Sequence, residues 1–373
     1  MIRVKKGQEE SLERSLEVVA ESVESPQMLL FYSRPGTLEQ AAAFFADRFP
    51  DIPTLGICST SVVCNGVVDE PDILLMSFDD EYRIACGLIR DLSQCPVQHV
   101  FQFQKDVESV GAGDEDTVCL EYCTGNEEML VTTLNAVLDK YDIPMVGSTV
   151  FEGLERMGKG EVAFCGDIFM DACIYAVIRC NRGKVRTYYE NIYMRTELTV
   201  HQVTKVDVDK RSIIEIDGRP AADVYCDVVQ VPRESIVEMN QRYPFGRVLG
   251  TRIFVADVAK VMPDGSLCCN KRLNPNDAIC FMDYGRYQEV ARETIERVQQ
   301  ENKNIYFTIT GDCIHRFWLY QSDKFLERHA NNLRRLGEHA GNICGGEQYH
   351  HQHINQSMVM IVFSYDTGEE GIA

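Results

Sequence analysis

The stretch that decides the fold of this chain is IYFTITGDCIHR, residues 305–316. Its first six residues are apolar or β-branched, which predicts a buried strand, and Gly-Asp then leads into a helical pattern. Farther along, GNICGGE at residues 341–347 predicts a second strand and a polar turn, after which Asn355 opens a last apolar run. This order of elements puts Arg316, Glu347 and Asn355 at strand ends, where loops meet and ligands usually bind.

Helix and strand patterns alternate along the rest of the chain. Residues 8–24 predict an acidic amphipathic helix, and residues 127–141 predict a helix that the Asn126 side chain would cap. Asp-Gly at 217–218 and Pro-Asp-Gly at 263–265 predict tight turns between strands. The expected fold class is therefore α/β (α+β), with two lobes of mixed, largely antiparallel sheets that helices flank.

One pattern recurs along the chain. A helix, a strand and a short turn lead into another strand at GICST (56–60), GST (147–149) and GGE (345–347), which suggests structurally related lobes. A length of 373 residues also predicts two domains, with Asn-Arg-Gly at 181–183 as the turn between them. We expect an N-terminal helix at 1–24, a first domain at 25–182 and a second domain at 183–373 that ends in a tail at 366–373.

The composition indicates a globular protein that does not bind nucleic acid. Hydrophobic residues make up 45% of the chain, and the formal net charge is −20. A nucleic-acid binder needs a basic surface, and anionic membranes also repel an acidic protein. The 15 cysteines are scattered without a Cys-x-x-Cys spacing, which argues against structural zinc and favours reduced thiols. No signal-peptide pattern and no apolar run of about 18 residues is visible, so a cytoplasmic protein without membrane insertion is expected.

Three polar residues of the second domain are the leading candidates for a ligand site. Arg316 would clamp a carboxylate through two parallel hydrogen bonds, unless it forms a structural pair with Asp312 or Glu347. Glu347 would bind an ammonium group or serve as a turn carboxylate, and Gly346 before it lets a ligand approach the backbone closely. Asn355 both donates and accepts, which suits an amide or carboxyl ligand as well as a turn cap.

Three further side chains are candidates for ligand contact or for nucleophilic catalysis. Ser59 and Thr60 follow a strand, and Cys313 lies shortly before Arg316. A nucleophile needs a base within reach, but the sequence has no Gly-x-Ser-x-Gly motif and no histidine near Ser59. We therefore expect a binding protein rather than an enzyme, and keep a hydrolase or transferase that uses Ser59, Thr60 or Cys313 as an alternative.

Histidines are the candidates for holding a metal or a haem iron. His350 and His353 belong to the densest histidine group, and His315 is a second candidate axial ligand. Imidazole nitrogens ligate such metals, with Cys344 or Cys313 as a thiolate partner. An exposed polar loop also accounts for the group, so the leading expectation is a protein without a cofactor.

Several short motifs follow one another in a characteristic order. They are CST at 58–60, PMVG at 144–147, IDGRPA at 216–221, YPFG at 243–246, DG at 264–265, CIHR at 313–316, GE at 346–347 and Asn355. In this order and spacing, over residues 25–365, the chain resembles the FIST family, with N-terminal and C-terminal FIST domains in tandem.

The resemblance implies an intracellular sensory module that binds a small ligand, such as an amino acid or a related metabolite. In bacteria such modules feed chemoreceptors of chemotaxis, histidine kinases or cyclic-dinucleotide enzymes, and in eukaryotes they accompany F-box segments. A small-molecule ligand and a signalling protein acting in trans are thus the implied partners. One bacterial branch resembles a haem-based nitric oxide sensor, so a haem-based or metal-based gas sensor is the alternative.

Overall fold

The computed structural model describes residues 1–113, 115–156, 158–196 and 198–365; the expected tail at 366–373 lies outside them. Contacts divide the chain into two compact units. The first contains residues 1–189, 293–353 and the segment that begins at Met358, and the second contains residues 190–292 and 354–357. Both units combine mixed or antiparallel sheets with helices, which confirms the predicted fold class. The domain boundaries at 24 and 182 stay predictions, since compactness alone does not define them.

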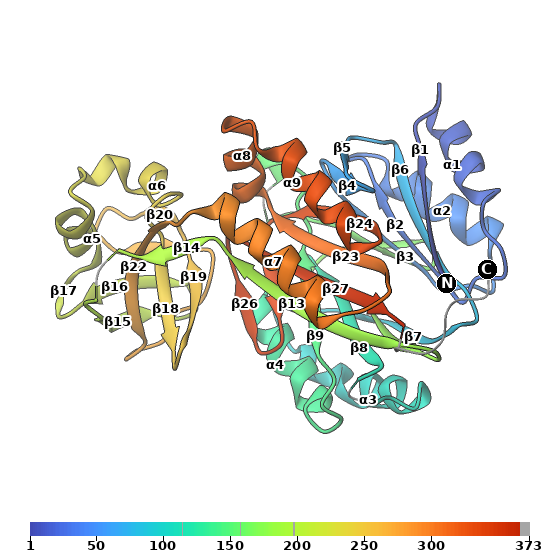
Figure 1. The fold of residues 1–373 in the computed structure, drawn as a ribbon. Helices are drawn as coiled ribbons and strands as arrows, with labels where there is room; N and C mark the ends of the chain where they lie inside the picture. Colours follow the sequence, from blue (N-terminus) through green and yellow to red (C-terminus); the bar gives the residue numbers. More distant parts are fainter. Residues whose placement is uncertain (114, 157, 197, 366–373) are drawn as a thin grey trace. The chain divides into compact units, whose positions relative to one another are not determined.

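The first unit contains three six-stranded sheets (Figure 1). The first sheet has the strand order β1 (Ile2–Gly7), β6 (Ile73–Phe78), β2 (Met28–Ser33), β3 (Thr54–Cys58), β10 (Val162–Phe164), β11 (Asp167–Phe169). The second has the order β26 (Gln352–Ile354), β25 (Glu347–Tyr349), β9 (Met145–Thr149), β8 (Thr117–Cys123), β12 (Cys173–Cys180), β7 (Tyr82–Ile89). The third has the order β13 (Lys184–Asn191), β27 (Ser357–Ser364), β23 (Ile305–Cys313), β24 (Glu338–Cys344), β4 (Val62–Cys64), β5 (Val67–Asp69).

Helices cover these sheets. They are α1 (Leu12–Ala20), α2 (Leu38–Arg48), η1 (Pro96–His99), α3 (Val100–Ser109), α4 (Glu127–Leu138), η2 (Leu154–Arg156), α7 (Tyr287–Glu301), α8 (Ile314–Ser322), α9 (Leu326–Leu333) and η4 (Arg334–Leu336). Figure 1 shows α3 and α4 side by side, and their apolar residues share one core cluster with β8 and β12. The boundary between the two units falls within α7.

Each of the three sheets contains one parallel pair of strands joined through helices. β2 and β3 are connected by α2, β8 and β9 by α4, and β23 and β24 by α8 and α9. Parallel neighbours need such a crossover because both strands run in the same direction. The three recurring motifs of the sequence lie where the second strand of each pair ends: GICST at the end of β3, GST at the end of β9 and GGE just after β24. The motifs therefore mark one strand–helix–strand arrangement that occurs three times within the first unit.

α4 shows how the sequence builds such a crossover. Leu130, Leu134 and Val137 are fully buried on its inner face. Asn126 holds the N-cap position with φ +53°, but its side chain makes no capping bond and donates to Asp171 at 3.1 Å instead. The predicted cap is wrong because the left-handed backbone and the bond to Asp171 orient the amide elsewhere.

The N-terminal segment contains the expected helix, α1, but a strand precedes it. β1 pairs with β6 in an antiparallel register and so forms one edge of the first sheet. Arg3 and Lys5 are exposed on this strand. A short segment in which charged residues alternate with apolar ones is easily missed as a strand when only the sequence is considered. Ser11 then caps α1, since its hydroxyl accepts from the amide of Arg14 at 3.2 Å.

The second unit contains one nine-stranded sheet. Its order is β19 (Arg252–Ala256), β18 (Phe245–Leu249), β22 (Ala278–Tyr284), β15 (His201–Asp207), β16 (Ser212–Ile216), β21 (Leu267–Cys269), β20 (Val258–Val261), with β14 (Tyr193–Arg195) beside β22 and β17 (Arg219–Pro220) beside β16. Its helices are α5 (Ala221–Val229), η3 (Arg233–Ser235) and α6 (Ile236–Met239). Its core packs Tyr225 against Phe245 and Phe281. In neither unit is a described helix both long and apolar enough to cross a membrane.

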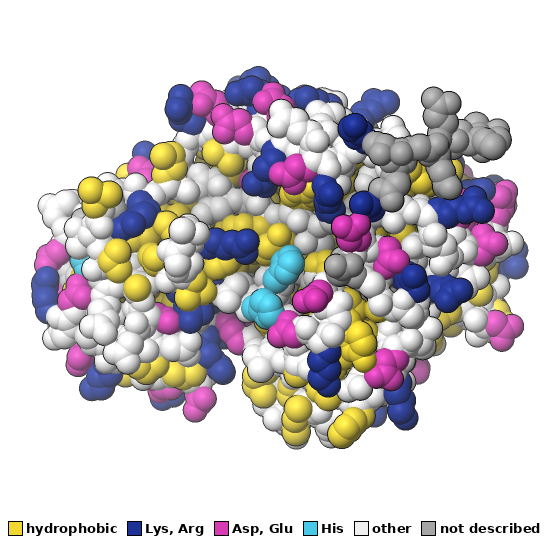
Figure 2. Space-filling view, turned by 60° about the horizontal axis from the view of Figure 1, so that its bottom comes forward, with side chains coloured by type: hydrophobic (Ala, Val, Ile, Leu, Met, Phe, Trp, Pro, Cys, Tyr) yellow, Lys and Arg dark blue, Asp and Glu magenta, His cyan; other side chains and the backbone are white. Residues whose placement is uncertain are grey.

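The surface carries both signs of charge despite the net charge of −20. Figure 2 shows acidic and basic side chains interspersed on the face that it presents, with histidines beside acidic groups. Ion pairs such as Arg3–Glu24 and Arg14–Glu17 are exposed. Because water and salt screen such pairs, each contributes little to stability.

We expect Gly56→Ala to destabilise the chain. A Cβ at Gly56 would lie 2.1 Å from Cζ of the buried Phe31 ring on the neighbouring strand, and the rigid ring cannot turn aside without displacing the core. Overpacking of this kind typically lowers the free energy of unfolding by about 1–3 kcal/mol, which urea denaturation measures. Gly345→Ala is the matched control because its Cβ would meet its nearest neighbours at 3.7 Å. An equal loss in both variants would rule out the steric explanation.

Candidate functional site

Arg316 forms a buried ion pair in the first turn of α8. Its side chain is fully buried, and its Nε donates to Oδ1 of Asp312 at 2.6 Å. Nε2 of His329 on α9 lies 3.0 Å from the other carboxylate oxygen. Burial alone would raise the pKa of Asp312, but the charge of Arg316 and the contact with His329 outweigh burial and lower this pKa. The structural Arg316–Asp312 pair considered from the sequence is thus present in the fold.

Glu347 lies near this pair. It is fully buried on β25 and accepts a hydrogen bond from the Cys344 thiol at 3.3 Å. Desolvation raises the pKa of Tyr189, the charge of Glu347 raises it further, and the charge of Arg316 opposes both. Arg316 and Glu347 are therefore both close enough to act electrostatically on one phenol.

Ser59 has a structural part in the turn after β3. Its hydroxyl donates to the carbonyl of Ser61 at 2.6 Å and accepts from the amide of Ile343 at 3.1 Å. The first bond closes the turn itself, and the second links it to β24. Thr60, the next residue, is half-buried.

The other residues predicted from the sequence lie on several elements. Cys313 is buried opposite Cys344 in the parallel register of β23 and β24. Gly346 is buried, and its carbonyl accepts from the amide of Thr149 at 2.8 Å. Asn355 is buried in the 354–357 segment of the second unit. Ligand contact by these residues stays a prediction.

The candidate metal ligands already make other contacts. Nε2 of His350 lies 3.1 Å from the Thr187 hydroxyl, and Nδ1 of His353 lies 3.1 Å from the Gln348 amide nitrogen. The His315 ring packs edge-on against the neighbouring tryptophan. Among the residues that the structure describes, no group of three or more His, Cys, Asp or Glu is arranged to hold a metal ion. A metal or haem bound by Nε2 of His350 or Nδ1 of His353 would have to replace these bonds, and such a cofactor stays a prediction.

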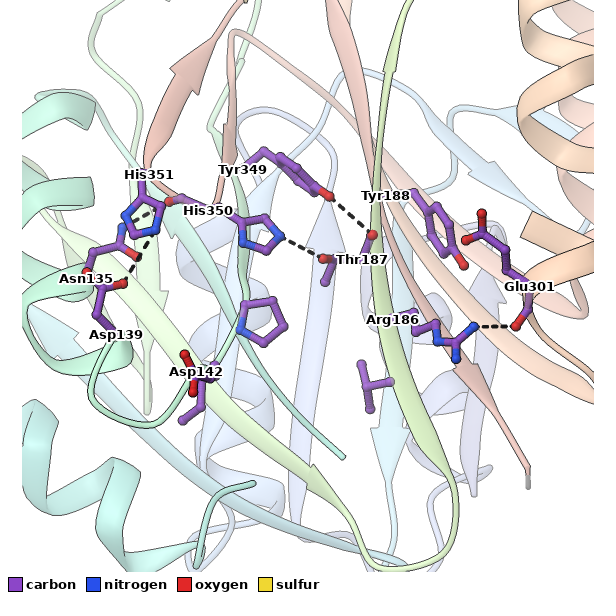
Figure 3. Close-up of a pocket in the computed structure, with 13 residues that line it drawn as sticks. Asn135, Asp139, Asp142, Arg186, Thr187, Tyr188, Glu301, Tyr349, His350 and His351 are labelled. Atoms are coloured by element: carbon purple, nitrogen blue, oxygen red, sulfur yellow. Dashed lines mark hydrogen bonds and ion pairs between the residues drawn. The ribbon is translucent and has the colours of Figure 1, made fainter. Parts of the chain in front are cut away.

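An open pocket lies beside β13 in the first unit (Figure 3). Its volume is about 540 Å³, within the usual range of small-ligand sites. The end of α4 with the loop after it, the turn after β25, and β13 itself form its walls. Its polar lining includes Asn135, Asp139, Asp142, Arg186, Thr187, Glu301 and the turn residues Tyr349, His350 and His351.

Hydrogen bonds hold the walls of the pocket in place. The Asn135 side chain donates to the carbonyl of His350 at 2.9 Å, and the amide of His350 donates to the carbonyl of Met145 at 2.8 Å. Across the pocket, the Tyr349 hydroxyl donates to the carbonyl of Thr187 at 3.3 Å. The pocket is therefore preformed rather than created by loose side chains.

Charged groups of both signs face this pocket. Figure 3 shows Asp139 and Asp142 on one side of His350, and Arg186 with Glu301 on the other. Arg186 is exposed, and its guanidinium donates to the backbone carbonyl of Glu301. One cavity thus offers carboxylates, a guanidinium and imidazoles to a ligand.

A second cavity of about 380 Å³ adjoins the first and shares Asn135, Asp139 and His351 with it. Nε2 of His351 lies 3.5 Å from a carboxylate oxygen of Asp139, and both side chains are 59% exposed. An exposed ion pair of this kind is weak. A ligand that extends into the second cavity would therefore need little free energy to separate His351 from Asp139.

Stacked tyrosine rings join the pocket to the buried ion pair. Tyr349 of the pocket stacks on Tyr189 with 5.7 Å between ring centroids. The pKa of Tyr189 responds in turn to the charges of Glu347 and Arg316. The open pocket and two of the residues predicted from the sequence are therefore neighbours within one unit.

The sequence pattern indicated His350 but not the charged residues that share its pocket. Asp139 and Asp142 follow α4, and Arg186 lies on β13, far from His350 in the sequence. None of the three belongs to a recognisable motif. The histidine group was the sequence feature that pointed to this pocket. It indicated one wall of the pocket but not the charged residues opposite that wall.

Glu121 is a buried carboxyl on the sheet face that α4 covers. It lies on β8, with one oxygen 3.5 Å from the Cys173 thiol and the other 2.0 Å from where a Cβ on Gly147 would lie. Burial raises the pKa of Glu121 to about 8, with help from the charge of Glu127 and against the Cys173 hydrogen bond. The carboxyl is therefore largely protonated at neutral pH, beneath the helix that supplies Asn135 to the pocket.

Comparison with protein-family models agrees with the order of the sequence motifs. Residues 27–219 match the FIST N domain, and residues 221–350 match the FIST C domain. The tandem resemblance stated from the sequence is thereby confirmed. A comparison with curated proteins found no match.

Arg316→Ala should destabilise the chain strongly. The change leaves the Asp312 carboxylate buried without its cation, and a loss of this kind typically lowers the free energy of unfolding by about 3–5 kcal/mol. Arg14→Ala removes the exposed pair with Glu17 on α1 and should leave the urea midpoint unchanged. If the two variants unfold alike, the buried pair does not stabilise the fold.

Glu121 should make the free energy of unfolding fall as the pH rises. Between pH 4.5 and about 8 the folded state keeps a proton that the unfolded chain releases, so folding is favoured by acid in this window. The contribution is fully present below pH 4.5 and is lost as the pH rises through about 8. Glu121→Gln has no proton to lose and should flatten this part of the profile of urea midpoints.

Glu39→Gln on the exposed face of α2 is the control for this pH effect. It should keep the slope of the parent protein. An unaltered slope in Glu121→Gln would show that other groups cause the pH dependence.

Proposed function

We propose that this chain, which belongs to the FIST family, senses a small polar metabolite through the pocket beside β13. FIST domains are generally sensory domains implicated in signal transduction. The observation that carries the proposal is the pocket of about 540 Å³, with walls held by hydrogen bonds to backbone carbonyls and lined by charged groups of both signs. Sites for small ligands commonly combine such a cavity with a few well-placed polar groups.

The proposed ligand is an amino acid or a related metabolite that carries an ammonium and a carboxylate. Asp139 and Asp142 offer carboxylates for the ammonium, and Arg186 offers a planar guanidinium for the carboxylate. Tyr349 adds a flat apolar surface between the two groups. A zwitterion would pair its charges with both sides of the pocket at once.

The residues predicted from the sequence are proposed as a second site for the same kind of ligand. They are Arg316, Glu347, Asn355, Thr60, Ser59, Gly346 and Cys313. The closeness of Arg316 and Glu347 to Tyr189 supports this second site. A ligand carboxylate there would compete with Asp312 for the fully buried guanidinium, so the open pocket is the better supported of the two.

The proposed output acts on a partner chain in the cytoplasm, such as a histidine kinase, a chemoreceptor of chemotaxis or a cyclic-dinucleotide enzyme. A ligand that binds one arrangement of its site more tightly shifts the protein toward that arrangement. Metabolite binding is better supported than haem or metal sensing, because His350 and His353 engage Thr187 and Gln348. It is also better supported than hydrolysis by Ser59, since that hydroxyl is bonded to backbone groups.

Asp142→Asn should weaken metabolite binding about tenfold or more, because a charged hydrogen bond is replaced by a neutral one. Thermal shift of the full chain against the twenty amino acids identifies ligands, and calorimetry gives the affinities. Asp142 has φ +54°, which asparagine tolerates, so the backbone of the variant is unstrained. Asp51→Asn, on an exposed loop, is the control. Equal affinities in the two variants would place the ligand outside this pocket.

A further inference from the structure

The outer edge of β13 forms one side of the pocket. β13 stands at the end of its sheet, next to β27. The amide of Val185 donates to the carbonyl of Glu115 at 2.9 Å, and the carbonyl of Thr187 accepts from the Tyr349 hydroxyl. Neither partner belongs to β27, so these backbone groups point away from the sheet. Because polar backbone groups alternate in direction along a strand, Val185 and Thr187 both present theirs on the outer side of β13, where the carbonyl of Thr187 meets Tyr349 of the pocket.

The space in front of this edge has the length of a short extended segment. The four consecutive residues Val185–Tyr188 line the pocket, and at about 3.3 Å per residue they extend over about 13 Å. The turn at 349–351 and the loop at 139–144 face them from the other side. A slot between a strand edge and a fixed wall is the geometry in which proteins accept a peptide as an added strand.

Carboxylates outnumber the permanent cations around this slot. Asp139, Asp142 and Glu301 line it together with Arg186, and Arg186 already donates to the backbone of Glu301. The whole chain carries a net charge of −20. Complementary charge speeds encounter and selects among partners, so the slot favours lysine or arginine side chains.

We propose that the slot beside β13 docks an extended, basic segment of a partner protein, which pairs with the outer edge of β13 as an added strand. An amide of the segment replaces the Tyr349 hydroxyl at the carbonyl of Thr187, and basic side chains lie toward Asp139 and Asp142. The docking does not depend on a metabolite. Where a metabolite binds, it fills the same space and excludes the segment.

Fluorescence anisotropy with the full chain tests the docking. The probe is a fluorescein-labelled, acetylated and amidated Lys-Val-Lys-Val-Lys-Val peptide, and saturable binding that weakens with salt is expected. Two N-methylated versions of the probe cover its two alternating sets of amides and keep its charge. One version should bind at least about tenfold more weakly than the other, because only one set faces β13. A Glu-Val-Glu-Val-Glu-Val peptide should not bind. No saturable binding, or equal binding by the two N-methylated peptides, overturns the proposal.

Two variants locate the probe at the slot. Tyr349→Phe removes the hydroxyl that competes for the carbonyl of Thr187 and should tighten binding several-fold. Asp142→Asn, on a surface loop, should weaken binding several-fold at low salt. Tyr243→Phe in the second unit is the control and should leave the affinity unchanged. Unchanged affinity in both slot variants, at unchanged melting temperature, overturns the proposal; if Tyr349→Phe melts early, Asp142→Asn alone decides. Metabolite binding is measured in separate titrations. The peptide-docking hypothesis and the metabolite hypothesis can therefore fail independently of each other.

Discussion

The charge of Arg316 is neutralised inside this protein by Asp312. Removing a guanidinium and a carboxylate from water opposes folding by several kcal/mol for each ion, and their attraction balances this only when the geometry is close and the remaining atoms are bonded. Here the two side chains are 0% and 5% exposed and meet at 2.6 Å, and His329 contacts the second carboxylate oxygen. The guanidinium also lies 5.2 Å from the centre of the Tyr320 ring, where its charge is attracted to the aromatic face. A fold that buries one of these side chains must therefore bring the others into contact with it.

This requirement ties distant elements together. Asp312 lies near the end of β23, Arg316 in the first turn of α8 and His329 on α9, so their contacts join a strand to both helices of its crossover. On the neighbouring strand, His339 contacts the hydroxyl of Thr310 at 2.9 Å. Burial, together with repulsion from His329, lowers the pKa of His339 to about 3. It therefore stays neutral.

The sequence could predict the elements better than the distances between their side chains. The apolar run at 305–310 and the turns after β3, β9 and β24 follow local rules, and the structure has strands and crossovers there. The spacing of Asp312 and Arg316 also made their pairing foreseeable, since side chains four residues apart can meet across a helix start.

The pocket depends on contacts that no local rule contains. Asp142 faces Arg186 because β13 of one sheet lies opposite the loop before β9 of another, and such packing is decided by the whole core. Asn126 illustrates the same limit on a smaller scale. Its capping role is a sound local expectation that a tertiary hydrogen bond to Asp171 overrides.

Two ways of passing on a signal differ in what they require of this structure. A route through the stacked Tyr349 and Tyr189 toward Arg316 needs an element with two discrete arrangements. The bonds of Asn135 and Met145 to His350, however, hold the pocket wall in a single arrangement. Direct competition between the metabolite and the partner segment needs no second arrangement of the protein. It needs only that both bind in the slot beside β13. A metabolite at one hundred times its Kd would then weaken the apparent affinity of the segment about a hundredfold, or about 2.7 kcal/mol. Rigid walls favour competition over conformational change. The edge of β13 is therefore the simplest place at which metabolite binding could control the binding of a partner.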